Sequence, residues 1–215
     1  MTVAVKICGV TEEAAVQAAI SGGARWIGLV FFPPSPRAVR PDQAARLAAG
    51  AAGRIGRVGL FVDPDDSLLE DTLRQVELDA LQLHGEETPR RVAEIRQRWG
   101  LPVMKAIKIA RAEDLAVVPD YAEAVDRILF DAKAPKDMAG ALPGGNALSF
   151  DWRLLAGRSW PKPWMLSGGL TPENLREAVS LTGTSAVDVS SGVEERPGVK
   201  DPARIAAFLE AAREV

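Results

Sequence analysis

Short runs rich in β-branched and other apolar residues recur along the chain, and segments with helical spacing lie between them. The first run is VAVKICGV, residues 3–10. Seven more follow, at residues 25–32, 57–62, 79–85, 102–109, 127–133, 163–169 and 185–192. Helical i, i+3, i+4, i+7 spacing links Leu175, Ala178, Val179 and Thr182, and likewise Ile205, Phe208, Leu209 and Ala212. The pattern predicts eight strands, each followed by a helix.

Regular alternation of strands and helices is typical of α/β proteins with a parallel sheet. A doubly wound open sheet has the same alternation, but eight units favour a closed (β/α)₈ TIM barrel. Thr88, Thr171 and Asp201 each stand directly before a proline, which is typical of a helix start. No linker or shift in composition divides the chain, so we expect residues 1–215 to form a single domain.

Composition excludes several classes of protein. The 215 residues carry a net charge of −3, which gives no basic surface for a nucleic-acid partner. No apolar run approaches the roughly 18 residues of a membrane span, and no secretory signal precedes the first strand near Val3. One cysteine rules out an internal disulfide, and one histidine removes most zinc-site patterns. We therefore expect a cytoplasmic protein without a metal site.

Two of the predicted strand–helix connections are longer than the others. PPSPRAVRP, residues 33–41, follows the second strand, and AKAPKDMAGALPGGNALS, residues 132–149, begins at the end of the sixth. Both could be plain surface insertions. Both also follow strands, and barrel enzymes build their active sites from the loops at the carboxyl ends of the strands. We expect both loops to border a functional site.

Three ionisable side chains are predicted to meet at that end of the barrel. Because strand side chains alternate in direction, Cys8 points away from Val5 and Ile7 and therefore inward. The same alternation turns Asp131 and Asp188 inward near the ends of the sixth and eighth strands. A lone cysteine is often only a small buried side chain, and a strand-end aspartate is often a helix cap. Their coincidence at one mouth favours a catalytic role.

A phosphate site is predicted from two glycine-containing loops. SGGLTPEN, residues 167–174, follows the seventh strand, and DVSSGVE, residues 188–194, runs through the end of the eighth. Glycines allow close backbone approach, and exposed N–H groups bind anions. Barrels commonly bind phosphate with the loops after strands seven and eight. The predicted substrate-binding residues here are Gly168, Gly169, Asp188, Ser190, Ser191 and Gly192.

Ordered motifs along nearly the whole chain carry a family resemblance. They are KICG, GLVFFPPSPR, GLFVD, LQLHGEE, ILFDA, SGGLTPENL and VDVSSGVEERPGVKD. With these motifs the chain resembles the phosphoribosylanthranilate isomerases of tryptophan biosynthesis. So many motifs in the same order make the resemblance specific.

The resemblance implies a reaction and a role for three residues. Cys8 would be the general base, Asp131 the general acid, and Arg37 the partner of the anthranilate carboxylate. The implied reaction is an Amadori rearrangement of an aminoaldose phosphate into an aminoketose phosphate. Both steps are proton transfers, so no cofactor is expected. The implied partner is a phosphorylated small molecule, and the chain is expected to be a monomer or a homodimer.

Several residues leave open interpretations. Lys6 lies one inward step below Cys8 and could lower the thiol pKa, but neutralising Asp188 or another buried carboxylate is the favoured role. His84 could be a hydrogen-bonded structural residue or a substrate contact. The family often has Gly-Gly-Thr-Gly after the sixth strand, where this chain has GGNA, residues Gly144 to Ala147. That departure puts in doubt whether this loop makes the same contacts with the substrate, but it does not change the expected reaction.

A barrel with this sequence pattern could also have another function. A related barrel could be a sugar-phosphate epimerase or the indole-forming synthase of the same pathway. The epimerase would require more histidines if it used a metal, and the synthase would require catalytic lysine and glutamate at strand ends. A barrel that binds a phosphorylated ligand without catalysis is the alternative outside enzymes. The presence of both Cys8 and Asp131 favours an enzyme.

Overall fold

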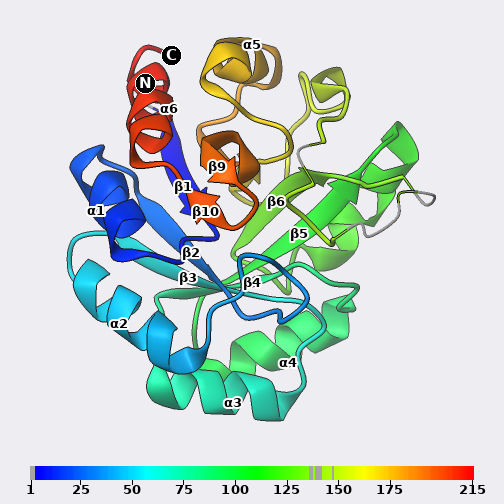
Figure 1. The fold of residues 1–215 in the computed structure, drawn as a ribbon. Coiled ribbons are helices and arrows are strands. Elements are labelled where there is room, and N and C mark those ends of the chain that lie inside the picture. The colour runs from blue at the N-terminus through cyan, green and yellow to red at the C-terminus, as the bar shows by residue number, and fades with distance from the viewer. Residues whose placement is uncertain (1–2, 136–137, 139–141, 147) are drawn as a thin grey trace.

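Eight parallel strands close into a barrel in the order β1 to β8 (Figure 1). The computed structural model describes residues 3–135, 138, 142–146 and 148–215. The strands are β1 (Ala4–Cys8), β2 (Trp26–Val30), β3 (Gly56–Phe61), β4 (Ala80–Leu83), β5 (Val103–Ile109), β6 (Arg127–Ala132), β7 (Trp164–Leu166) and β8 (Ala186–Val189). Each strand lies within one of the predicted runs or overlaps it closely. The predicted TIM barrel is confirmed.

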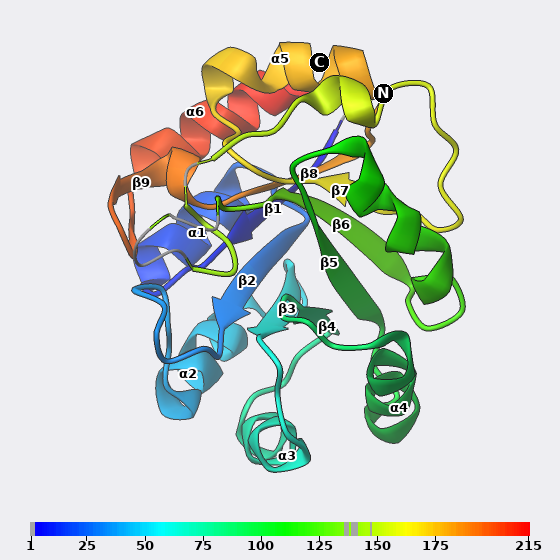
Figure 2. The same ribbon diagram turned by 90° about the vertical axis from the view of Figure 1, so that its right-hand side faces the viewer.

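In the described part of the chain six α-helices cover the barrel, and Figure 2 shows α5 and α6 along one side of it and α2, α3 and α4 along the opposite side. They are α1 (Glu13–Ser21), α2 (Pro41–Ala51), α3 (Asp66–Gln75), α4 (Pro89–Trp99), α5 (Pro172–Thr182) and α6 (Pro202–Arg213). Helices α4, α5 and α6 begin at the predicted prolines. Thr88 and Asp201 accept hydrogen bonds from backbone N–H groups of the first turn. No helix among the described residues is both long and apolar enough to span a membrane.

The prediction of a helix after every strand is wrong at two positions. The 3₁₀ segment η1 (Ala112–Tyr121) follows β5, and the short 3₁₀ turn η2 (Trp152–Leu154) precedes β7. Pro119 lies inside η1, where it lacks the N–H that an α-helix would use. The connection after β6 is rich in glycine and proline, which disfavour a helix.

The interior of the barrel is layered. An apolar layer of Met104, Ala106, Leu129, Met165 and Ala186 fills the inside of the strands. Lys6 pairs in register with Asp188 across β1 and β8. Alternate residues such as Ile7 and Val187 belong to the large core that the strands form with the helices. Full burial of an isoleucine stabilises the fold by about 1.5–3 kcal/mol. Strand alternation therefore separates the residues that pack against the helices from those that point into the barrel, as predicted.

A small hairpin after β8 was not predicted. It pairs β9 (Glu194–Arg196) with β10 (Val199–Lys200) and follows the 3₁₀ turn η3 (Ser191–Val193). Gly198 has φ +85°, and a Cβ there would lie 2.3 Å from the Pro36 carbonyl oxygen. Only glycine permits this close approach. The hairpin therefore packs on the loop after β2 at the mouth of the barrel.

Candidate active site

A cavity at the carboxyl ends of the strands contains about 750 Å³ of unfilled space, part of it open to solvent. Its lining includes every predicted catalytic and substrate-binding residue: Cys8, Arg37, Asp131, Gly168, Gly169, Asp188, Ser190, Ser191 and Gly192. These residues come from five different connections and strand ends. The convergence predicted from strand alternation is present in the structure.

Lys6 is fully buried and forms an ion pair with Asp188. Its Nζ lies 2.8 Å from Asp188 Oδ1, and the Asp188 side chain is 4% exposed. Burial alone would lower the pKa of Lys6, but the charge of Asp188 outweighs it and raises the pKa above its usual value. The favoured interpretation, that Lys6 neutralises Asp188, is confirmed.

The Cys8 thiol lies close to this ion pair. A Cβ on Gly28 would lie 2.9 Å from both Cys8 Sγ and Lys6 Nζ, so glycine on β2 makes room for both. Burial raises the pKa of Cys8, and the charge of Asp188 raises it further, while Lys6 lowers it. The net direction is upward. Lys6 therefore does not lower the thiol pKa below its usual value, and the thiol is protonated at neutral pH.

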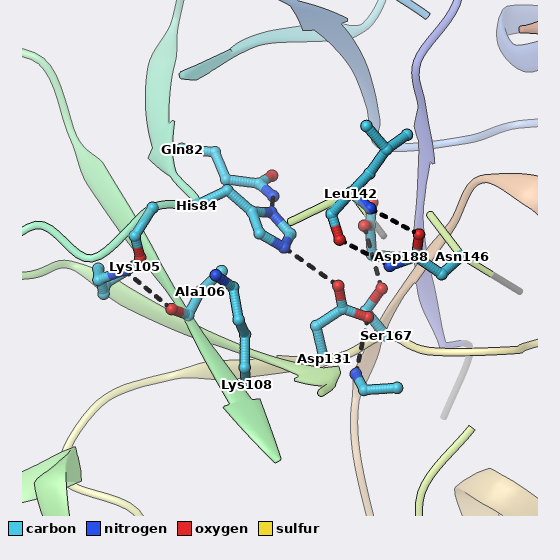
Figure 3. A network of polar contacts seen from close by, with 12 residues as sticks. Gln82, His84, Lys105, Ala106, Lys108, Asp131, Leu142, Asn146, Ser167 and Asp188 are labelled. Carbon is cyan, nitrogen blue, oxygen red and sulfur yellow. Dashed lines mark hydrogen bonds and ion pairs between the residues drawn. The ribbon is translucent and has the colours of Figure 1, made fainter. Parts of the chain in front are cut away.

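Asp131 lies in a line of buried polar groups that Figure 3 shows. His84 Nε2 lies 3.1 Å from Asp131 Oδ2, and Gln82 Nε2 lies 2.9 Å from His84 Nδ1. The other carboxyl oxygen, Oδ1, accepts a hydrogen bond from the Ala132 N–H at 2.9 Å. His84 also lines the cavity. The structure shows the predicted hydrogen bonding of His84, and one partner is the predicted acid, while a contact of His84 with the substrate stays a prediction.

Arg37 is held by a carboxylate that the sequence analysis did not single out. Glu194 accepts from Arg37 Nε at 2.7 Å and from Nη2 at 2.8 Å, and Arg37 Nη2 also donates to the Gly145 carbonyl at 3.1 Å. Burial would raise the pKa of Glu194, but hydrogen bonding by Arg37 and the charge of Lys200 lower it. Glu194 is therefore a carboxylate placed between two cations.

Lys200 extends this network to the predicted phosphate loop. Its Nζ lies 2.6 Å from Glu194 Oε1 and 3.1 Å from the Ser190 carbonyl oxygen. Burial lowers the pKa of Lys200 despite the charge of Glu194. The Ser190 hydroxyl in turn donates to the Cys8 carbonyl at 3.1 Å. Both Glu194 and Lys200 lie in the motif VDVSSGVEERPGVKD, and their charge within a glycine-containing loop was the available signal.

The two predicted phosphate loops are shaped by their glycines. Gly168 and Gly169 have φ values of +95° and +66°, and a Cβ on Gly168 would lie 2.9 Å from the Ala132 nitrogen. Asn174 fixes the loop, because its side chain donates to the Gly169 carbonyl and accepts from the Thr171 N–H, both at 2.8 Å. The loop after β7 is therefore closely packed on the end of β6.

Part of the long loop after β6 closes the cavity. Gly144, Gly145 and Asn146 line it, whereas Ala147, the last residue of the GGNA departure, lies outside the described residues. Asn146 holds the turn through two hydrogen bonds with the backbone of Leu142, at 2.7 and 3.0 Å. Among the described residues, no group of three or more His, Cys, Asp or Glu side chains is placed to hold a metal ion.

Comparison with known proteins gives one consistent family. The profile of N-(5'-phosphoribosyl)anthranilate (PRA) isomerase matches residues 5–211. The N-(5'-phosphoribosyl)anthranilate isomerase of Paramagnetospirillum magneticum is 58% identical over 213 residues, which are 99% of this chain and 98% of that protein. The isomerase of Rhodospirillum centenum is 61% identical over 209 residues, 97% of each chain.

Solved structures agree with the sequence matches. The phosphoribosylanthranilate isomerase of Thermotoga maritima superposes with a TM-score of 0.88 at 36% identity, over 99% of this chain and 100% of that one. Another phosphoribosylanthranilate isomerase structure, in complex with reduced 1-(o-carboxyphenylamino)-1-deoxyribulose 5-phosphate, superposes with a TM-score of 0.83 at 34% identity, over 99% and 100%. From its sequence, its barrel and these matches, the chain belongs to the phosphoribosylanthranilate isomerase family.

Proposed function

We propose that the protein isomerises N-(5'-phosphoribosyl)anthranilate to 1-(2-carboxyphenylamino)-1-deoxyribulose 5-phosphate in tryptophan biosynthesis. One observation carries the proposal: Cys8 and Asp131 line the same cavity as Arg37 and the two glycine-containing loops. That cavity therefore offers a base, an acid, a carboxylate partner and a phosphate site. The related isomerase bound to a reduced carboxyphenylamino-deoxyribulose phosphate supports the same substrate class.

Two proton transfers make up the proposed mechanism. Asp131 protonates the ribose ring oxygen, and the C1–O bond breaks to give an iminium ion. The Cys8 thiolate then removes the proton from C2, which gives an enolamine that tautomerises to the ketone. During tautomerisation C1 gains a proton and the C2 hydroxyl loses one, so the overall reaction consumes no proton. An acid and a base that line one cavity, from the ends of β6 and β1, meet this requirement.

Substrate binding follows from the charges around the cavity. Arg37 attracts the anthranilate carboxylate, and the loops at Gly168–Gly169 and Ser190–Gly192 hold the phosphate through backbone N–H groups. Asp188 borders the same cavity, and its charge is balanced by Lys6. We therefore propose Asp188 as a binding residue for the sugar rather than as a second base. No metal or organic cofactor enters these steps.

The proposal also covers the cellular location, the oligomeric state and the partners of the protein. We place the reaction in the cytoplasm and expect a monomer or a homodimer that acts on a small phosphorylated molecule. Nucleic acid and membranes are not expected partners. For comparison, the structure of monomers generated from the dimeric phosphoribosylanthranilate isomerase of Thermotoga maritima has also been solved.

Freshly prepared phosphoribosylanthranilate provides the direct test. Its fluorescence should fall on addition of the protein, and inorganic phosphate should slow the fall by competing for the phosphate site. A protein that binds the substrate but leaves its fluorescence unchanged would be a non-catalytic ligand-binding barrel. A protein that neither binds nor turns over phosphoribosylanthranilate would contradict the proposed substrate.

A further inference from the structure

Asp131 is the end of a chain of contacts that starts on β4. Gln82 lies on β4, and His84 directly follows the end of that strand. Because the two residues are two positions apart, their side chains point to the same side. Both are buried, and both contacts along the chain are within hydrogen-bond distance, at 2.9 and 3.1 Å. Figure 3 shows the imidazole between the Gln82 amide and the Asp131 carboxyl.

The orientation of the Gln82 amide selects the tautomer of His84. Gln82 Nε2 faces His84 Nδ1, and Oε1 accepts no hydrogen bond from the described residues. Turning the amide over would leave its NH₂ group, with two donors, in place of that single unpartnered oxygen. The observed orientation leaves one N–H and Oε1 unpaired, whereas the turned amide would leave both N–H groups unpaired, and buried N–H groups without a partner are rarer than under-satisfied carbonyl oxygens. The observed orientation makes Nδ1 the acceptor and puts the ring hydrogen on Nε2.

A hydrogen on His84 Nε2 points directly at Asp131. The carboxyl then accepts one hydrogen bond on each oxygen, from His84 on Oδ2 and from the Ala132 N–H on Oδ1. Two donors in fixed positions hold the carboxyl plane in one orientation at the cavity wall.

The turn after β4 is anchored independently of the cavity. Lys105 donates to the Gly85 carbonyl at 2.8 Å and pairs with Glu87 at 3.0 Å, both side chains being at most 2% exposed. Glu87 also accepts from the Gly85 N–H. The N–H and the carbonyl of Gly85 are therefore both held by hydrogen bonds. This fixes the backbone next to His84 and so the position of the imidazole.

Gly144 covers the contact between His84 and Asp131. A Cβ at position 144 would lie 2.7 Å from His84 Nε2 and 2.9 Å from Asp131 Oδ2. The backbone of the loop after β6 thus packs on this hydrogen bond. The other ionisable groups of the cavity, Cys8, Arg37 and Asp188, line the same space, but none of them hydrogen-bonds to the imidazole in the structure.

We infer that Gln82 and His84 form a positioning pair for Asp131: Gln82 fixes His84 as the Nε2–H tautomer, and His84 orients the carboxyl that donates the proton. This inference rests on the proposed role of Asp131 as the acid. It assigns no contact between His84 and the reacting atoms. It also gives the loop glycine Gly144 a purpose, which is to seal this hydrogen bond without displacing it.

The tautomer can be measured directly, because His84 is the only histidine of the chain. Protein labelled with ¹⁵N and free of a histidine tag should show a protonated Nε2 and an unprotonated Nδ1 at neutral pH. The matched variant Gln82→Glu offers Nδ1 only acceptors, so the ring should gain a hydrogen on Nδ1. The inference would be overturned if the wild-type ring carried its single hydrogen on Nδ1 or were an imidazolium at neutral pH. It would also be overturned if Gln82→Glu left the tautomer unchanged.

Two substitutions of His84 test its effect on the acid. Gln can place its amide nitrogen near the position of Nε2 and keep the donor to Asp131, whereas Asn is too short to do so. We expect His84→Asn to lower kcat by about 10-fold or more, a fraction of what a general acid contributes, with KM nearly unchanged. His84→Gln should recover most of that loss, and the two variants should have similar thermal stability.

Equal loss in both variants, or full activity in His84→Asn, would contradict the positioning role. The spectroscopic result does not depend on turnover. A wild-type protein that shows the Nε2–H tautomer but leaves phosphoribosylanthranilate unchanged would disprove the proposed function alone. A wild-type protein that turns over the substrate with the other tautomer would disprove the inference alone.

Discussion

Glu194 accepts hydrogen bonds from both Nε and Nη2 of Arg37, at 2.7 and 2.8 Å. This pairing occupies the Nε–Nη2 edge of the guanidinium. Nη1 is the guanidinium nitrogen without a partner among the described residues. A substrate carboxylate would meet Arg37 through Nη1 while Glu194 keeps the group oriented. In the proposed function, Arg37 would therefore have a structural and a binding task at once.

Replacement of Arg37 should separate these tasks. Arg37→Ala should raise KM strongly, since the carboxylate partner is lost. Arg37→Lys keeps the charge but cannot form the two parallel bonds to Glu194, so it should restore only part of the affinity. Steady-state kinetics of both variants measure this, and full recovery of KM by lysine would show that the orientation set by Glu194 is unimportant.

Substitution of Glu194 tests the network from its other end. Glu194→Gln removes the charge between Arg37 and Lys200, and charge-assisted hydrogen bonds contribute about 1.5–3 kcal/mol each. We expect KM to rise about 10-fold, the equivalent of roughly 1.4 kcal/mol. Because Lys200 contacts the Ser190 carbonyl, inhibition by inorganic phosphate should weaken as well. Unchanged values for both constants would disconnect the hairpin from binding.

Cys8 is the only cysteine, so alkylation of the protein reports on this thiol alone. Burial and Asp188 raise its pKa, so the thiol is protonated below its usual pKa of roughly 8.5. Alkylation by iodoacetamide should be slow at neutral pH and speed up only above that value, and kcat/KM should rise with pH over the same range. A fast reaction at neutral pH would show that the thiolate is already present there.

A serine in place of Cys8 tests the chemistry. Because a hydroxyl is a much weaker base than a thiolate, Cys8→Ser should lower kcat by about 10²-fold or more, with little change in substrate affinity. Near-normal turnover by this variant would return Cys8 to the role of a small buried side chain.

The Lys6–Asp188 ion pair should be costly to break from one side. Lys6→Met leaves a buried carboxylate without its partner, which destabilises a protein by about 3–5 kcal/mol. The double variant Lys6→Met, Asp188→Asn removes both charges and should recover part of that loss. Urea unfolding of the three proteins measures the difference, and a single variant as stable as wild type would show that solvent or another cation compensates Asp188.

Side-chain alternation predicted the part of the site that lies on the strands, because the direction of a side chain in a strand depends only on its position, whereas the barrel was predicted from the count of eight strand–helix units. Alternation placed Cys8, Asp131 and Asp188 at one mouth without knowledge of any contact. The sequence could not reveal the partner of Arg37, because Glu194 lies 157 positions away and no local spacing connects the two.

The direction of the Cys8 pKa could not be predicted for a different reason. Lys6 and Asp188 act on the thiol with opposite signs, and burial adds to the effect of Asp188. Which effect is larger depends on distances and burial that alternation does not give. The missing helix after β5 has a simpler reason, since Pro119 interrupts the segment in which the regular pattern predicts a helix.

The most direct test of the acid–base pair is the rate of Asp131→Asn with phosphoribosylanthranilate, followed by fluorescence across the pH range in which the wild type is active. Asn keeps the shape of the side chain but has no acidic proton to donate. We predict a loss of about 10²- to 10⁴-fold in kcat, nearly unchanged competition by inorganic phosphate, and a pH dependence that retains only the rise due to Cys8. Turnover close to that of the wild type would contradict the assignment of Asp131 as the acid.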